Sequence, residues 1–130
     1  MKLEIESRLI AEYKELFPLV DIMKDKTKSC MYWGIDCEDG WAPILETVFK
    51  KFMLLKDKPI LAQVKEKFGT LHIYLDNETD EASKIVEEAE IASEHICEIC
   101  GEPGYLRRNN GWYMVRCENH HQEFLEKMKK

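Results

Sequence analysis

The chain has 130 residues, of which 45% are hydrophobic and 34% are charged. This length suits one domain with a modest core, and the composition excludes disordered, collagen-like and membrane-spanning proteins. The formal net charge of −6 argues against a protein whose whole surface binds a nucleic-acid backbone. No apolar run resembles a membrane span or a secretory signal, so we expect a cytoplasmic protein with no membrane contact.

Charge divides the chain into two parts. Residues 1–96 carry 13 basic and 20 acidic side chains, whereas residues 97–130 carry six and five. We therefore expect an acidic α+β body over residues 1–96. A small module with a C-terminal helix is expected over residues 97–130.

The first third of the chain predicts one helix and one ordered loop. Apolar residues between Leu3 and Phe17 recur every three or four positions, which indicates an amphipathic helix that Pro18 ends. Residues 21–29 are rich in lysine and are expected to form an exposed connection. Residues 30–41 contain too many aromatic side chains for a linker, so we expect a loop that packs on the core.

The middle of the chain predicts a helix, a hairpin and a second helix. Pro43 suits the first turn of a helix over residues 42–55. Apolar and polar residues then alternate on both sides of Gly69, which predicts two short antiparallel strands. Beyond Asn77 a helix start signal precedes one apolar stripe that runs to Ile96.

The C-terminal segment predicts a second hairpin and a last helix. Asn110-Gly111 separates two short apolar segments and favours a tight turn, because both residues tolerate positive φ. Residues 121–130 have helical spacing. Together these elements predict an α+β fold, with helices packed on a short antiparallel β-hairpin or sheet and a C-terminal zinc-ribbon-like module.

The strongest chemical signal is a CxxC…CxxH pattern formed by Cys97, Cys100, Cys117 and His120. A hairpin between the two pairs would bring them together around one tetrahedral ion. Three thiolates and one imidazole favour Zn²⁺, and four protein ligands leave no coordination position for a reacting water. The sequence therefore predicts a structural zinc site.

The sequence leaves the choice of histidine ligand and the roles of the other two cysteines undecided. His121 and His95 compete with His120 as the fourth ligand. Cys30 and Cys37 are expected to be small apolar core residues, with a second metal site or a redox pair as the alternative.

A basic and aromatic surface is a candidate for binding a partner or a nucleic acid. It contains Arg107, Arg108, Arg116 and Trp112. Such a set is typical of nucleic-acid-binding surfaces, but it also occurs on an ordinary solvated face. Trp33 and Trp41, in the loop over residues 30–41, are separate candidates for a partner surface, with a place in the core as the alternative.

Catalysis finds no support in the sequence. A zinc-bound HNH nuclease needs a general-base histidine between its knuckles, and residues 101–116 contain no histidine. A deaminase needs His-x-Glu before its cysteine pair, whereas His72 is followed by Ile73 and Tyr74. P-loop, GxGxxG and GxSxG motifs are absent from the sequence. We therefore expect a protein that is not an enzyme.

Several motifs together resemble a family of small bacteriophage and prophage proteins without an established common activity. They are Cys37-Glu38-Asp39-Gly40-Trp41, Val64 to Leu71 with the sequence VKEKFGTL, and Cys97-x-x-Cys100-Gly101 through Gly111-Trp112 to Cys117-x-x-His120. The resemblance implies a phage-associated origin and a zinc-ribbon-like end.

A phage protein of this kind is expected to bind and inhibit or redirect a host protein, most readily in anti-defence, as anti-CRISPR proteins do. A nucleic-acid-binding zinc-ribbon module is the alternative. The edges of the hairpin over residues 64–75 could also pair with a second copy of the chain, which would give a homodimer.

Overall fold

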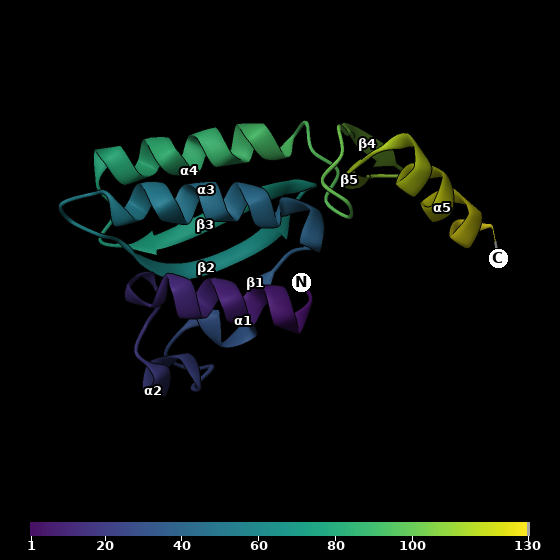
Figure 1. Ribbon diagram of the computed structural model, residues 1–130. Coiled ribbons are helices and arrows are strands. Elements are labelled where there is room, and N and C mark those ends of the chain that lie inside the picture. Colours follow the sequence, from purple (N-terminus) through teal and green to yellow (C-terminus); the bar gives the residue numbers. More distant parts are fainter. Residues whose placement is uncertain (130) are drawn as a thin grey trace.

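The computed structural model describes residues 1–129 and shows an α+β body with a smaller module at one end (Figure 1). Lys130, where the sequence places the end of the C-terminal module, lies outside the described residues. The α-helices of the described chain are α1 (Leu3–Glu12), α2 (Val20–Met23), α3 (Ala42–Met53), α4 (Asp80–Ser93) and α5 (Glu118–Met128). Its strands are β1 (Ile35–Asp36), β2 (Ile60–Lys67), β3 (Thr70–Asp76), β4 (Tyr105–Asn109) and β5 (Trp112–Arg116).

The body contains a three-stranded sheet in the order β1-β2-β3. Strands β2 and β3 form the predicted antiparallel hairpin, whose turn places Phe68 and Gly69 at φ values of 53° and 89°. Strand β1 pairs with β2 in the parallel direction, with Ile35 opposite Val64. The sheet is therefore mixed, where the sequence predicted an antiparallel one.

Three helices pack together with this sheet, and α3 lies between α1 and α4 (Figure 1). The rings of Tyr13 and Phe17 pack on Phe49 of α3, with centroids 5.5 and 5.8 Å away. Leu61, Val64, Leu71 and Ile73 of the sheet belong to the same buried cluster. The apolar residues that recur along the helices and strands therefore pack into one core, because the apolar faces of helices and sheet are buried against each other.

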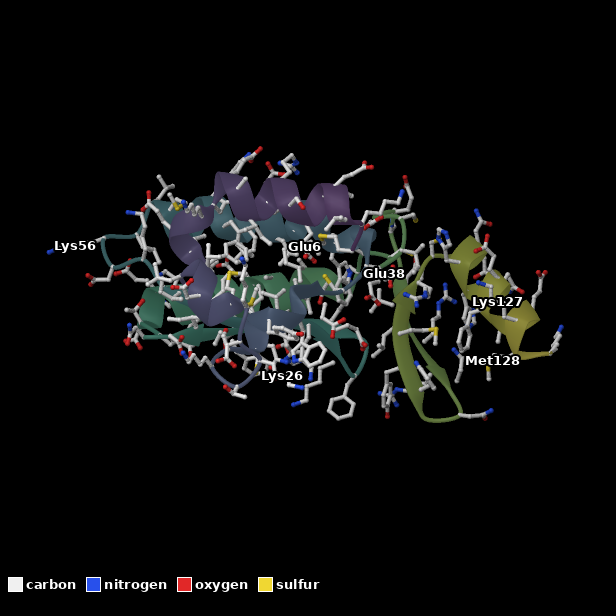
Figure 2. All side chains as sticks on the ribbon, turned by 90° about the horizontal axis from the view of Figure 1, so that it is seen from below. Glu6, Lys26, Glu38, Lys56, Lys127 and Met128 are labelled. Carbon is white, nitrogen blue, oxygen red and sulfur yellow. The ribbon has the colours of Figure 1, made fainter. Side chains whose placement is uncertain are left out.

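Both edges of the sheet carry a covering contact. At the β3 edge, the backbone N–H of Leu71 donates a hydrogen bond of 2.9 Å to the buried Oγ of Ser93 on α4. At the other edge, which is β1, the backbone N–H of Ile35 donates a hydrogen bond of 3.2 Å to the carboxylate of Glu6 on α1 (Figure 2). At these two amides, a strand of a second chain would find no free backbone donor, which disfavours the homodimer pairing through this sheet that the sequence suggested.

Element boundaries differ from the expectations near the N-terminus. Helix α1 stops at Glu12, and a 3₁₀ turn over Lys14–Leu16 continues the chain to the buried Phe17. The expected connection over residues 21–29 begins inside the short helix α2. The loop over residues 30–41 is ordered as expected, with 3₁₀ turns on both sides of β1.

Candidate metal centre

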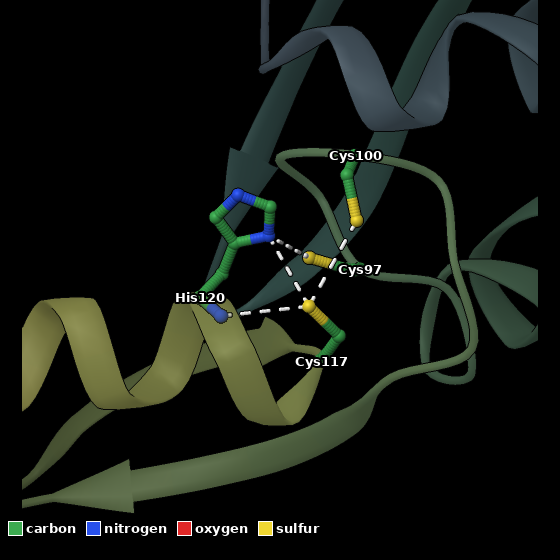
Figure 3. A group of neighbouring side chains, drawn as sticks. All are labelled: Cys97, Cys100, Cys117 and His120. Carbon is green, nitrogen blue, oxygen red and sulfur yellow. Dashed lines mark hydrogen bonds between the residues drawn. The ribbon is translucent and has the colours of Figure 1, made fainter.

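Four side chains gather where the module joins the body: Cys97, Cys100, Cys117 and His120. One ligand atom from each lies within 4.8 Å of the others (Figure 3). The Sγ atoms of Cys100 and Cys117 are 3.8 Å apart. Nδ1 of His120 lies 3.6 Å from Sγ of Cys97 and 3.2 Å from Sγ of Cys117. The predicted ligand set is thus brought together and can hold a metal ion.

The first pair of ligands sits in a tight turn after α4. The N–H of Gly101 donates a hydrogen bond of 2.9 Å to the carbonyl oxygen of Cys97, and Gly101 has a φ of 82°. This left-handed conformation favours glycine. The turn therefore points both thiols of Cys97 and Cys100 toward the same volume.

The second pair comes from the start of α5. Cys117 is the N-cap residue, and its Sγ accepts a hydrogen bond of 3.5 Å from the N–H of His120. Strands β4 and β5 return the chain to this point through the predicted turn, where Asn110 and Gly111 have φ values of 53° and 83°. The hairpin thus brings the two halves of the cluster together, as the spacing predicted.

The thiols have unequal acidities before any metal binds. Burial raises the pKa of Cys97, but hydrogen bonds from the backbone N–H groups of Cys117, Cys100 and Ile99 outweigh it and lower the pKa to about 7. At Cys100, the backbone N–H of Glu102 favours the thiolate, yet burial and the neighbouring thiols raise the pKa to about 11. A cation would remove this mutual repulsion between thiolates.

The metal cluster is anchored to the body by the segment Glu38–Trp41. The N–H of Gly40 donates a hydrogen bond of 2.7 Å to the carbonyl oxygen of Glu98. Nε1 of the buried Trp41 donates one of 2.9 Å to the carbonyl oxygen of Ile96. A side chain at Gly40 would overlap the carbonyl oxygens of Cys97 and Glu98. This close backbone approach holds the turn that carries Cys97 and Cys100, here called the knuckle, against the body.

Glu98 is a buried carboxylate within this contact. Its oxygens accept hydrogen bonds from the N–H of Glu38, at 3.1 Å, and from the guanidinium of Arg116, at 3.2 Å. Burial raises the pKa of Glu98, and the Glu38 N–H and Arg116 partly offset that rise. Glu98 thus joins the body, the knuckle and β5 in one polar network.

The remaining histidine and cysteine alternatives are resolved by position. Nε2 of His121 lies 3.3 Å from Oδ1 of Asn109, and His95 is exposed, so the cluster contains His120 alone of the three candidates. Cys37 is buried, and burial raises the pKa of its thiol. Cys30 is exposed rather than in the core, and neither cysteine joins a metal cluster or a disulfide in the described chain.

The candidate surface residues lie in different environments. Arg107 lies on β4, where it donates to the carbonyl oxygen of Arg116 and pairs with Glu118 at 3.6 Å. Arg116 is half-buried against Glu98. Trp41 is fully buried, so the core alternative is correct for it and its place on a partner surface was wrong; its indole N–H donates to the carbonyl oxygen of Ile96.

Three of the predicted surface residues are accessible. Arg108 is exposed, and its guanidinium carbon lies 5.4 Å from the ring centroid of Tyr113. Trp112 is 68% exposed at the start of β5, and Trp33 is 66% exposed in the turn before β1. The sequence analysis did not identify Gly40, Glu98 or Phe68 as site or surface residues. Of the three, only Gly40 stood in a motif, Asp39-Gly40-Trp41, that pointed to a turn.

Comparison of the chain with protein-family models, curated proteins and solved structures gave no match. Among residues 1–129, no helix combines the length and apolar character that crossing a bilayer requires.

Proposed function

We propose that the chain is a non-catalytic binding protein whose C-terminal module is held together by a structural zinc ion. Its partner would be a host protein, and binding would inhibit or redirect that protein in favour of a phage. The resemblance of its motifs to small phage proteins supports this context. The class of target that we propose is a defence nuclease or effector. Specific binding needs about 800 Å² of surface on each partner, which a chain of this size can supply.

The spacing of the ligand atoms supports zinc as the metal. Tetrahedral bonds of about 2.3 Å to sulfur and about 2.0–2.1 Å to nitrogen separate two sulfurs by about 3.8 Å and a sulfur from a nitrogen by about 3.6 Å. The corresponding separations here are 3.8 Å for Cys100 and Cys117, and 3.6 Å for Cys97 and His120. The 3.2 Å separation of Cys117 and His120 would lengthen slightly around an ion.

The observation that carries a structural role for the metal is that four protein ligands converge on one point. Four ligands complete the coordination of a tetrahedral ion, so no position is left for a water or a substrate. The module buries few large apolar side chains of its own; Met114 and Val115 are its buried members after the knuckle. Metal binding would therefore contribute much of its folding free energy.

Nucleic-acid binding is the second candidate function. It is favoured by the exposed Trp112 and Arg108, because an aromatic ring and a cation together suit an unpaired base and its phosphate. It is weakened by the acidic partners of Arg107 and Arg116, which neutralise two of the cations that it needs.

Metal analysis tests the first half of the proposal. Elemental analysis of the purified chain should find one zinc per chain. His120→Ala should lower that content, whereas His121→Ala should leave it unchanged. Cobalt substituted for zinc should give the absorption spectrum of a tetrahedral thiolate site that added azide does not alter, since no coordination position is open.

Capture and gel-shift experiments test the second half. The zinc-loaded chain should retain a host protein from lysate, and the chelated chain should retain less of it. The proposal fails if a single-stranded oligonucleotide binds tightly with a steep salt dependence while no protein is retained, because that pattern indicates phosphate recognition.

A further inference from the structure

We infer that the partner protein binds at the hollow between the tips of the two β-hairpins, with Phe68 and Trp112 as its principal anchors. This inference rests on the proposed function and names the surface that performs it. The partner segment that fits carries apolar side chains flanked by carboxylates.

The β2–β3 turn of the body contacts the strands of the β4–β5 hairpin in the metal module. A Cβ added at Gly69 would lie 2.9 Å from Cδ1 of Leu106 and 3.1 Å from the backbone of Tyr113 and Met114. The β2–β3 turn therefore packs directly on the β4–β5 hairpin. An open hollow of about 340 Å³ lies between the tips and is lined by Phe68, Trp112 and Tyr113, together with Glu66, Asn110 and Gly111.

Large apolar side chains stand exposed around this hollow. Phe68 is 71% exposed and Trp112 is 68% exposed, and Leu106, which faces Gly69, is also exposed. Aromatic side chains at the centre of a patch commonly dominate the binding energy of protein interfaces. Exposure at both tips is therefore the pattern expected of a docking surface.

Phe68 occupies its place at a conformational cost. Its φ of 53° lies in the left-handed region, where a bulky residue is an outlier and where two-residue hairpins prefer Asn or Gly. Asn110, at the corresponding position of the other hairpin, has the same φ of 53°. A residue that is both strained and exposed gains nothing from folding, so its role lies in what it contacts outside the chain.

The charges around the tips indicate an acidic partner. The Nζ of Lys67 lies 5.8 Å from the ring centroid of Phe68, and Arg108 stacks on Tyr113. Within residues 1–129, neither Lys67 nor Arg108 forms an ion pair, in contrast to Arg107 and Arg116. Glu66 is occupied by the N–H of Gly69, which donates to it at 2.6 Å. Two cations without an ion pair among the described residues thus lie beside the rings of Phe68 and Tyr113, on a chain that is acidic overall.

Selection from a displayed library of short random peptides, with the zinc-loaded chain as bait, tests the inference. Selected sequences should combine Asp or Glu with apolar residues. A synthetic peptide of such a sequence should bind roughly tenfold or more weakly to Phe68→Asn and to Trp112→Ala. Arg108→Glu should weaken binding similarly, and added salt should weaken binding to the unmodified chain.

Phe68→Asn separates binding from folding, because asparagine suits the left-handed turn and should leave the melting temperature equal or higher. The matched controls remove exposed apolar side chains elsewhere. Trp33→Ala and Leu54→Asn, at positions 66% and 86% exposed, should leave the peptide affinity within about twofold.

Three results would overturn the inference. If selected peptides bind Phe68→Asn and Trp112→Ala as tightly as the unmodified chain, the docking surface lies elsewhere and the protein-binding function stands. If no peptide is selected and a single-stranded oligonucleotide binds in a Trp112-dependent manner, both the inference and the proposed function fail. If neither probe binds, the tips are not a docking surface.

Discussion

The backbone N–H of Gly40 donates a hydrogen bond of 2.7 Å to the carbonyl oxygen of Glu98, which lies between the first two cysteines of the metal cluster. This bond joins the 3₁₀ turn that precedes α3 to the turn of Cys97 and Cys100 that follows α4. The position of the module on the body therefore depends on a residue without a side chain.

Gly40→Ala should destabilise the chain by about 3 kcal/mol or more, because its methyl group would overlap the carbonyl oxygens of Cys97 and Glu98. Urea denaturation of the zinc-loaded chain would measure the loss. Gly111→Ala is the matched control: its methyl group meets no atom within 4 Å, and only its φ of 83° costs energy, about 1–2 kcal/mol. Equal losses for both variants would contradict the close approach.

Ser93→Ala should cost about 1–3 kcal/mol, because it leaves the buried N–H of Leu71 without an acceptor. Hydrogen exchange should show faster exchange of the Leu71 amide. Ser83→Ala removes an exposed hydroxyl that bonds Glu78, and it should change stability by less than about 0.5 kcal/mol. An unchanged Leu71 exchange rate in Ser93→Ala would show that another group satisfies this amide.

Thiol labelling should follow exposure. In the zinc-loaded chain, iodoacetamide near neutral pH should modify the exposed Cys30 and leave Cys37, because burial raises the pKa of the Cys37 thiol and excludes the reagent. Chelation should add the three cluster cysteines to the labelled set, and unfolding should add Cys37. Peptide mapping by mass spectrometry distinguishes these steps. Labelling of Cys37 before unfolding would contradict its burial.

Zinc affinity should fall as the pH is lowered. The ligands bind as thiolates and neutral imidazole, so protons compete with the metal for them. In the metal-free site the pKa of Cys97 is about 7 and that of Cys100 is about 11, so binding near neutral pH must displace protons from Cys100. Competition with a chromophoric chelator at several pH values would measure the slope. A pH-independent affinity would contradict a thiolate ligand set.

The sequence predicted elements whose signals are local. Asn110-Gly111 predicted one turn and the alternation around Gly69 predicted the other, because turn conformations depend on the residues that occupy them. The three cysteine ligands were likewise predicted by spacing, whereas the choice of His120 over His121 and His95 required the structure. Strand β1 was missed, since its two residues are too few to show an alternation and its pairing with β2 is a long-range contact.

Side-chain environments were harder to predict than elements. Arg116 and Trp41 were placed on a candidate surface, yet Glu98 and the carbonyl oxygen of Ile96 hold them inside the junction between body and module. These partners lie 18 and 55 positions away along the chain. Periodicity carries no information on such distant pairs, so only tertiary structure could assign these two residues.

The hydroxyl of Ser93 has a consequence for the behaviour of the sheet outside the native fold. Because it accepts a hydrogen bond from the amide of Leu71 near the start of β3, an incoming chain finds this donor already paired and cannot use it to propagate a fibril. Growth of amyloid from this end of β3 must await the detachment of α4, so conditions that melt this helix should promote fibrillisation.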